Sequence, residues 1–360
     1  MALSIKEKLQ AKVAGRFKWL TKKTAILGGA ALILIPAVVG AFSYGAMLSV
    51  QPESGTLSGG TTTVADASAS GGQSVKFGAP GPCPGSPNQP DGEDPWGGCW
   101  PGPETTGVPS GVSLTAYGGP CTINDYNSVS PVTITGVDAT SCPMISVQNS
   151  IDVNITNSKL PVINMTNASG DLTVTDSELH DGGGYYGVLW GHNITAQRVH
   201  ITGGQHSVHC EGACSITDSY LTGQNAPDGA ATHNNAFISN GGVNMQIGHN
   251  TLHCSPELNA DDGGCTADLS LFGDFDILQD ITISNNLFMA TPSGGFCGSF
   301  GYNPGKPYGS NPTNIAVTNN VFQRGSNNQC GVFGPTTSFI AANGNTWSGN
   351  VWDNGGTISP

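Results

Sequence analysis

Two stretches of the sequence are almost identical: ITISNNLF at Ile281–Phe288 is followed, 34 residues later, by IAVTNNVF at Ile315–Phe322. Looser copies of the same unit recur along the chain, each with an apolar residue, a polar pair and a second large apolar residue. The copies are Ile155–Leu160, Val174–Leu179, Ala196–Ile201, Ile216–Leu221, Ile247–Leu252, Ile283–Phe288, Val317–Phe322 and Ala342–Trp347, after two looser ones that begin at Leu114 and Ile134. A basic spacing of about 20 residues, in segments rich in Thr, Val and Ile, predicts a solenoid of short stacked β-strands.

The polar pair predicts a sharp corner at the same place in every coil. The pairs are Asn157-Ser158, Asp176-Ser177, Asp218-Ser219, His249-Asn250, Asn285-Asn286 and Asn319-Asn320. Asn and Asp tolerate the left-handed backbone that such a corner demands, and stacked amides can hydrogen-bond in a ladder. We therefore interpret these residues as structural. Asp176, Arg198 and Asp218 share this place in consecutive coils and predict a stack of alternating charge.

A second strand repeats in register with the first. It appears as GVLWG at Gly187, SVHCE at Ser207, AFISN at Ala236, SLFGD at Ser270, GSFGY at Gly298 and GVFGP at Gly331. Stacked coils of this kind form parallel sheets around an apolar interior. We expect an all-β fold, a parallel β-helix of about ten coils over residues 104–360.

The charge of the chain is uneven and acidic. Seven of the 12 basic residues lie within residues 1–23, which leaves five basic residues against 24 acidic ones in the rest. Nucleic acid is excluded as a partner, because neutralising phosphates requires Lys and Arg.

Residues 24–48 belong to an uncharged, apolar run that is long enough to cross a bilayer. We expect a single transmembrane anchor, with the basic residues 1–23 in the cytoplasm and the rest of the chain outside. The alternative is a signal peptide cleaved near Ser43–Gly45, which would make the protein secreted. Residues 49–103 are rich in Gly, Ser and Pro, which predicts a disordered linker followed by an irregular lead-in.

All ten cysteines follow residue 80, and an even number in an exported chain indicates disulfides. Cys297 and Cys330 lie at nearly the same distance from the starts of consecutive units, as do Cys121 and Cys142, so each pair should join adjacent coils. The other predicted pairs are Cys83–Cys99 in the lead-in, Cys254–Cys265 closing a loop, and Cys210–Cys214 as the remaining pair.

These features resemble the right-handed parallel β-helix proteins of the pectate-lyase-like superfamily. More narrowly, TGVPSGVSLTAYGGPCTI at Thr106–Ile123 and the closing SGNVWDNGG from Ser348 resemble a group of exported bacterial β-helix proteins. Enzymes of the superfamily cleave or epimerise polysaccharides. The basic residue and calcium-binding acids of its lyases have no counterpart in coils so poor in Lys and Arg. Asp261-Asp262 resembles the clustered aspartates of its hydrolases, and His233 matches a His-x-Asp whose acid is here Asn235.

The candidate catalytic and ligand-binding residues lie in the loops inserted between the two repeated strands. Stacking of the coils should place these loops along one side of the solenoid. Loops on a rigid solenoid are the usual place for binding groups. For acid–base work on a glycan we predict His206, His233, Asp228, Asp261 and Asp262 as catalytic residues. The predicted substrate-binding residues are His180, Asp181, Tyr185, His253 and Tyr302. A calcium site would use Glu257, Asp261, Asp262 and Asp268.

Two interpretations of single features stay open beside these. The acidic loop residues could instead be an ordinary solvated surface. His209 falls in a column with Leu189 and Ile238, which favours a core histidine over a catalytic one.

The expected function is binding or processing of an extracellular polysaccharide, with a lyase or a glycoside hydrolase as the enzymatic form. Because the chain is acidic, neutral or amino sugars are favoured over polyuronates as the substrate. The alternative is a non-catalytic surface or adhesion scaffold.

Overall fold

The computed structural model describes residues 83–124, 130–149, 152–166, 170–184, 186–291 and 293–360, together with the two strands β1 (Thr62–Ala65) and β2 (Gln73–Lys76). The chain divides into two compact units, Met1–Gly81 and Pro82–Pro360. In the first unit, β1 and β2 pair antiparallel inside the stretch predicted to be a disordered linker. The predicted cytoplasmic segment 1–23 and membrane segment 24–48 lie outside the described residues. No helix in the described part of the chain is long and apolar enough to cross a membrane.

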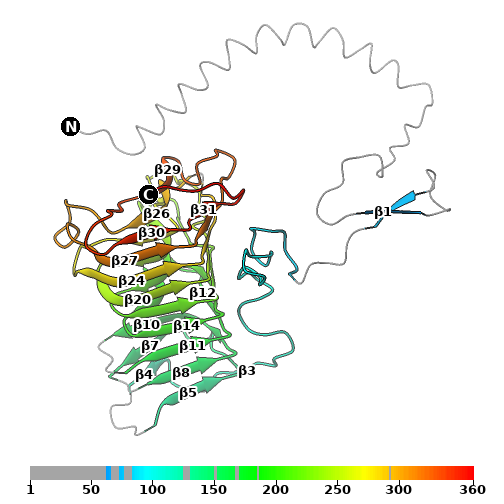
Figure 1. Cartoon of the computed structure of the whole chain (residues 1–360). Coiled ribbons are helices and arrows are strands. Elements are labelled where there is room, and N and C mark those ends of the chain that lie inside the picture. The colour runs from blue at the N-terminus through cyan, green and yellow to red at the C-terminus, as the bar shows by residue number, and fades with distance from the viewer. Residues whose placement is uncertain are drawn as a thin grey trace. The chain divides into compact units, whose positions relative to one another are not determined.

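The second unit is a parallel β-helix, as the repeat predicts (Figure 1). Within the described residues, each coil contributes a strand to sheet I, turns a sharp corner into sheet II, and continues through a loop into sheet III. Sheet II contains ten strands, in agreement with the expected number of coils. All described pairings between coils are parallel, and the strands stack from β5 at one end to β30 and β31 at the other (Figure 1).

Each sheet takes one strand from successive coils. Sheet I contains β5 (Val132–Thr135), β8 (Val153–Thr156), β11 (Leu172–Thr175), β14 (Ile194–Gln197), β17 (Cys214–Thr217), β20 (Gly242–Gly248), β24 (Leu278–Ser284), β27 (Thr313–Thr318) and β30 (Thr346–Ser348). Sheet II contains β3 (Thr115–Ala116), β6 (Val137–Asp138), β9 (Lys159–Leu160), β12 (Glu178–Asp181), β15 (His200–Gly203), β18 (Tyr220–Leu221), β21 (Thr251–Leu252), β25 (Leu287–Phe288), β28 (Val321–Phe322) and β31 (Val351–Trp352). Sheet III contains β4 (Thr122–Ile123), β7 (Met144–Gln148), β10 (Val162–Thr166), β13 (Gly187–Gly191), β16 (His206–Cys210), β19 (His233–Ser239), β23 (Leu269–Leu271), β26 (Phe296–Phe300) and β29 (Gly334–Thr337), with β22 (Gly264–Cys265) paired to β19.

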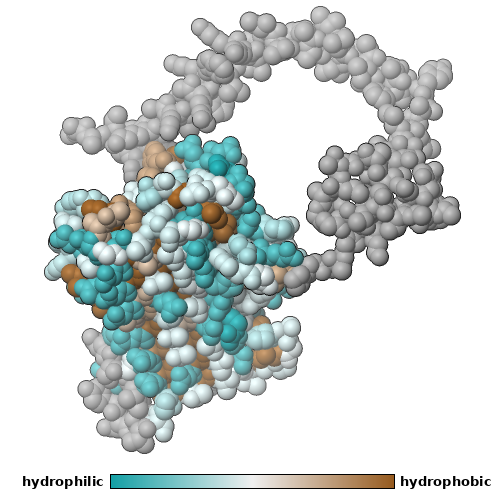
Figure 2. All heavy atoms as spheres, viewed as in Figure 1, coloured by the Kyte–Doolittle hydropathy of each residue, from teal (hydrophilic) through white to brown (hydrophobic). Residues whose placement is uncertain are grey.

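The interior of the helix is a continuous column of apolar side chains. In β11, Leu172 and Val174 are buried while Thr173 and Thr175 are partly exposed, which is the alternation expected when one face of a strand packs inside. Phe288 and Phe322 stack inside consecutive coils, with their ring centroids 4.4 Å apart. Residues that face outward are therefore the ones available for binding or catalysis. The face of the molecule seen in Figure 2 is mostly hydrophilic or neutral, with small hydrophobic patches.

The corner between sheets I and II has the conformation that the polar pairs predict. The first residue of each pair has a positive φ, from 50° at Asp176 to 57° at Asn285. The second residue is buried, and three of these residues, Asn250, Asn286 and Asn320, form a side-chain amide ladder that Asn350 of the next coil continues. In the Asn320 rung, Oδ1 accepts hydrogen bonds from the backbone N–H and Nδ2 of Asn286, while Nδ2 donates to Ile283 O and Asn350 Oδ1.

The predicted charge stack and cross-links are also confirmed. Nε of Arg198 donates to the carboxylate of Asp176 at 2.6 Å. All five predicted disulfides are present: Cys83–Cys99, Cys121–Cys142, Cys210–Cys214, Cys254–Cys265 and Cys297–Cys330. Cys121–Cys142 and Cys297–Cys330 each connect strands or loops of adjacent coils, which is the arrangement that the repeat spacing requires.

Residues 83–107, which we call the lead-in segment, pack against the outer face of sheet II and its corner. Trp100 is fully buried and clusters with Leu287 and Val321, which point outward from β25 and β28. Asn88 donates to the backbone carbonyl of Asp353 at one end of the segment. At the other end, the backbone N–H of Gly107 donates to Arg198 O. The lead-in segment therefore spans several coils.

Replacing Asn320 with Ala should lower the free energy of unfolding by about 2–4 kcal/mol, because it removes four buried hydrogen bonds and leaves the backbone N–H of Asn286 without its acceptor. The matched control is Asn319→Gly at the neighbouring corner position, where φ is 56° and the side chain is exposed. Urea unfolding should show a clear loss of stability for the first variant and little change for the second. Equal effects would contradict a stabilising ladder.

Candidate functional site

Sheet III carries a row of outward-facing side chains that the parallel register places one above another. Asn164, Trp190, His209 and Ile238 are direct partners in successive coils. The register pairs Gly187 with His206, so His209 lies beside Trp190 and not beside Leu189 as the sequence alignment had it. His209 is nevertheless buried, with 4% of its surface exposed, and its Nε2 lies 3.4 Å from Nδ2 of Asn240, as expected of a buried, hydrogen-bonded histidine. The one-residue difference in register places its side chain on the face of the strand opposite Val208.

Four rings from β13, β16 and the residue before β13 form an aromatic cluster: Tyr186, Trp190, His206 and His209. The Tyr186 ring lies edge-on to both imidazoles, with centroid distances of 4.7 Å to His206 and 4.8 Å to His209. The Trp190 indole stacks on His209 at 5.6 Å and 24°. Gly187 makes this packing possible, because a Cβ there would lie 2.9 Å from Cβ of His209.

Several polar atoms of this cluster are buried and have no hydrogen-bond partner among the described residues. They are both ring nitrogens of His206, Nδ1 of His209, Nε1 of Trp190 and, in the neighbouring coil, Oδ1 of Asn164. His206 is only 1% exposed. Leaving a buried polar group unpaired costs about 1–3 kcal/mol, so several such groups in one place require an explanation beyond packing.

Both imidazoles of the cluster are neutral at physiological pH. Burial, with smaller contributions from His209 and His233, lowers the pKa of His206 to about 3. Burial also lowers the pKa of His209 to about 4, although the charge of Glu211 acts in the opposite direction. A neutral imidazole offers one N–H donor and one nitrogen acceptor, which is the pattern that a hydroxyl group can match.

The predicted catalytic residues do not all gather at this cluster. His206 belongs to it, and His233, exposed at the start of β19, lies near enough for its charge to lower the pKa of His206. Asp228, Asp261 and Asp262 lie in two loops that are bonded to each other, with the backbone N–H of Gly229 donating to the Asp261 carboxylate at 2.6 Å. Among the described residues, neither imidazole is hydrogen-bonded to any of these acids.

The predicted substrate-binding residues lie mostly on sheet II and the loops that follow it. Nδ1 of His180 lies 2.8 Å from Thr202 Oγ1, and Nδ1 of His253 lies 3.2 Å from Thr222 Oγ1. Asp181 is buried, and its carboxylate accepts hydrogen bonds from the backbone N–H groups of Gly183 and Gly184. Tyr302 is partly buried in the loop after β26, and Tyr185 lies outside the described residues.

The four acids predicted to bind calcium are not collected into one ligand group. Within the described residues, the group of candidate ligand atoms that includes Asp268 contains Cys297 and Cys330, whose sulfur atoms form a disulfide, and none of the other three acids. Asp268 is fully buried, and burial raises its pKa well above the usual value, which disfavours the charged form that a calcium ligand needs. Glu257 and Asp261 are exposed, and Asp262 is partly so.

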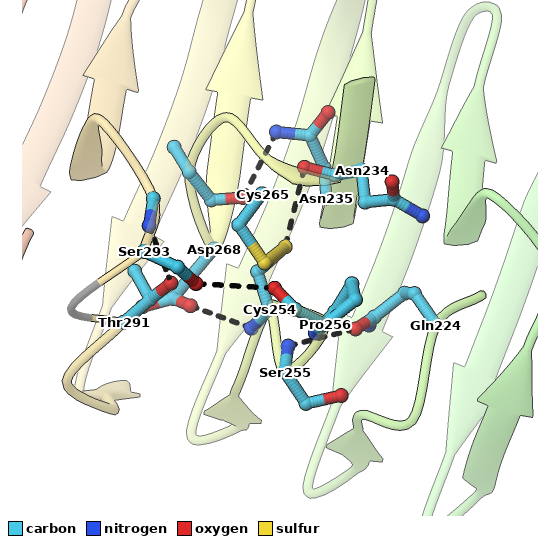
Figure 3. Close-up of a disulfide and its surroundings, with 12 residues drawn as sticks. Gln224, Asn234, Asn235, Cys254, Ser255, Pro256, Cys265, Asp268, Thr291 and Ser293 are labelled. Carbon is cyan, nitrogen blue, oxygen red and sulfur yellow. Dashed lines mark hydrogen bonds between the residues drawn. A yellow bond between two sulfur atoms is a disulfide. The ribbon is translucent and has the colours of Figure 1, made fainter. Parts of the chain in front are cut away.

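Asp268 instead supports the loop wall beside sheet III (Figure 3). Its Oδ1 accepts the backbone N–H of Cys254 at 2.7 Å, next to the Cys254–Cys265 disulfide. Gln224 accepts from the backbone N–H of Ser255, and Nδ2 of Asn235 donates to Ala267 O. These bonds hold the loops of three coils together. Asn235 is also the register partner of His206, so this wall lies directly beside the aromatic cluster.

Sequence reasoning identified His206 but missed the rest of the cluster. It favoured Tyr185 over Tyr186 and assigned His209 to the interior. One sequence signal could have identified these residues: consecutive copies of the second strand each contain a ring-bearing residue, Trp190 in one and His209 in the next. The exact strand register is needed to place them on the outer face.

Comparisons with known proteins add no assignment. No protein-family model matches the chain, and no curated protein or solved structure is similar to it.

Lowering the pH should destabilise the protein through His206. Its folded pKa of about 3 lies below the unfolded value of 6.5, so above pH 6.5 neither state is protonated and the effect is absent. As the pH falls from 6.5 towards 3, the unfolded state takes up a proton that the native state does not. The total cost is on the order of 5 kcal/mol.

A His206→Gln variant cannot titrate and should lose less stability than the wild type between pH 7 and about pH 4.5, in urea unfolding experiments. His180→Gln is the control, because His180 is exposed. If His206→Gln and wild type lose stability in parallel, the imidazole is not held neutral by burial.

Proposed function

We propose that this protein binds an uncharged polysaccharide on the outer face of sheet III, at the aromatic cluster of Tyr186, Trp190, His206 and His209. The observation that carries the proposal is the group of unpartnered polar atoms buried beneath the exposed Tyr186 and the partly exposed Trp190 rings. Tyr186 is 37% exposed, so one ring of the cluster is open to a ligand. Ligand sites of this type combine apolar and aromatic walls with a few polar groups that fix orientation.

The stacked geometry suits a chain-like ligand. Neighbouring coils present their side chains at intervals of about 4.8 Å, so a polymer lying along the helix axis meets a new row of residues at each step. Asn164, Trp190, His209 and Ile238 form such a row through four coils. Aromatic faces provide area at low conformational cost, while the amide and imidazole groups match hydroxyls.

The distribution of cations supports a neutral ligand over a polyuronate. After residue 103 the chain contains only Lys159, Arg198, Lys306 and Arg324 as basic residues. Lys159, Arg198 and Lys306 are ion-paired with Glu178, Asp176 and Asp274, and Arg324 lies over the Trp352 ring. Within the described residues, none of these four cations is bonded to the aromatic cluster, where a carboxylated sugar would need one.

Binding is better supported than cleavage. Lyase or hydrolase chemistry on a glycan calls for an acid and a base on the two sides of the reacting bond. The described contacts of His206 and His209 include no carboxylate partner. Processing of the polysaccharide, with His206 and His233 as acid–base residues, remains the enzymatic form of the same proposal.

The five disulfides are typical of a protein that folds in an oxidising compartment outside the cytoplasm. On the sequence pattern we further propose that residues 24–48 anchor the chain in a membrane with the β-helix outside. We also propose that the helix is right-handed and belongs to the pectate-lyase-like superfamily. Its three-sheet coil and its asparagine ladder support that relationship.

A glycan-array screen of the full-length protein, with and without calcium, tests the proposed function. Trp190→Ala should weaken binding of any neutral glycan found by at least about tenfold, because it removes a stacked aromatic wall from the site. Tyr308→Ala is the matched control: Tyr308 is a 45% exposed aromatic residue outside the cluster, and its loss should leave affinity unchanged.

Release of reducing ends or unsaturated products from a bound glycan would assign processing in addition to binding. Failure to bind or cleave any glycan would reject the proposal and leave the non-catalytic surface scaffold as the function. Binding that Tyr308→Ala abolishes and Trp190→Ala leaves intact would place the site elsewhere.

A further inference from the structure

His249 lies at a coil corner where the lead-in segment crosses the β-helix. It occupies the first position of its polar pair, with a φ of 51°. Its imidazole lies between two carboxylates from different parts of the chain. Nδ1 is 2.7 Å from Asp218 Oδ1 in the preceding coil, and Nε2 is 3.1 Å from Asp94 Oδ2 in the lead-in segment.

The same imidazole is packed against the lead-in segment through its ring faces. Trp100 stacks on it with a centroid distance of 5.7 Å and an angle of 25°, and Trp96 lies edge-on at 6.4 Å. Trp100 is itself fully buried against Leu287 and Val321 of sheet II. His249 is therefore bonded to, and stacked with, the part of the lead-in segment that covers the sheet.

The charged groups around His249 favour its protonated form. Burial lowers its pKa, but the carboxylates of Asp218 and Asp94 outweigh burial, and the pKa lies above 6.5. Asp218 also accepts a hydrogen bond from Gln197 and is influenced by the charge of Arg198. With both nitrogens protonated, each donates to one carboxylate. After loss of one proton, an unprotonated nitrogen faces a carboxylate, lone pair against lone pair.

We propose that His249 is a proton-dependent latch: it fastens the lead-in segment to the coils while the imidazole is charged, and the segment loosens when that proton is lost. The direction of the pH effect follows from linkage between protonation and folding. A group whose pKa is higher in the folded than in the unfolded state stabilises the folded state fully at pH values below its unfolded pKa. That stabilisation is lost as the pH rises through the folded pKa. Release of the latch would uncover Leu287, Val321 and the outer face of sheet II.

The other coil corners supply variants that fit the same backbone. Arg198 occupies the equivalent position with a φ of 51° and pairs with Asp176 of the preceding coil. Asn285 and Asn319 occupy it as uncharged residues with φ values of 57° and 56°. His249→Arg should therefore hold a permanent positive charge at the corner, and His249→Asn a permanently neutral side chain, without strain in the turn.

Hydrogen exchange of the full-length protein, followed by mass spectrometry and corrected for intrinsic exchange rates, measures opening of residues 83–107 against pH. In the wild type, the equilibrium constant for opening of this segment should increase severalfold between about pH 5.5 and about pH 9.5. The increase approaches tenfold for each unit by which the pKa of His249 in the closed segment exceeds its pKa in the open one. Peptides from the buried strands β11 and β24 should show no such increase.

The variants decide between the latch and general loosening. His249→Arg should keep the segment closed over the whole pH range, and His249→Asn should leave it open to the same extent at every pH. The proposal is overturned if the wild-type segment shows no pH dependence, or if all three proteins show the same dependence. An increase shared by β11 and β24 would also overturn it, because it would indicate global unfolding.

Discussion

Backbone hydrogen bonding between successive coils is the constraint on which the rest of the structure depends. A parallel ladder fixes which residue lies above which, and in this chain it is reinforced at the corner by buried amides that bond from Asn250 to Asn350. The interior then follows, because alternate side chains of every strand must point inward. Residues far apart in the sequence thus become neighbours, as in the cross-links Cys121–Cys142 and Cys297–Cys330.

The same constraint produces the outer surface. Once β13 and β16 are in register, Trp190 must stack on His209, and Gly187 leaves room for the neighbouring rings. Burying two neutral histidines with three of their ring nitrogens unpaired among the described residues costs stability. Local destabilisation of this kind is common at functional sites. On sheet II, by contrast, the lead-in segment covers outward-facing apolar side chains, and its Asp94 carboxylate contacts His249. The molecule therefore has one outer face, on sheet III, that carries the aromatic cluster, and one, on sheet II, that is covered by its own chain.

Much of the fold is predictable from the sequence, because a solenoid repeats the same local structure in every coil. The corner conformation at Asn285, the ladder at Asn286 and the coil-to-coil disulfides follow from residue type and spacing alone. The candidate site is less predictable, because it depends on register to within one residue. The position of His209 beside Trp190 could not be predicted without the exact register. The lead-in segment is irregular as expected, but its packing on sheet II could not be predicted, because Pro and Gly give no periodic signal. Asp268 shows the same limit, since its carboxyl group is buried and its pKa is raised, although its sequence neighbours suggest an exposed acid.

Disulfide mapping tests the stacked register most directly. Proteolysis of the non-reduced full-length protein, followed by mass spectrometry of the linked peptides, identifies the partner of each half-cystine. The account predicts that Cys121 is joined to Cys142 and Cys297 to Cys330, each across adjacent coils. Either pair bonded to a different cysteine would contradict the register and, with it, the aromatic cluster on sheet III.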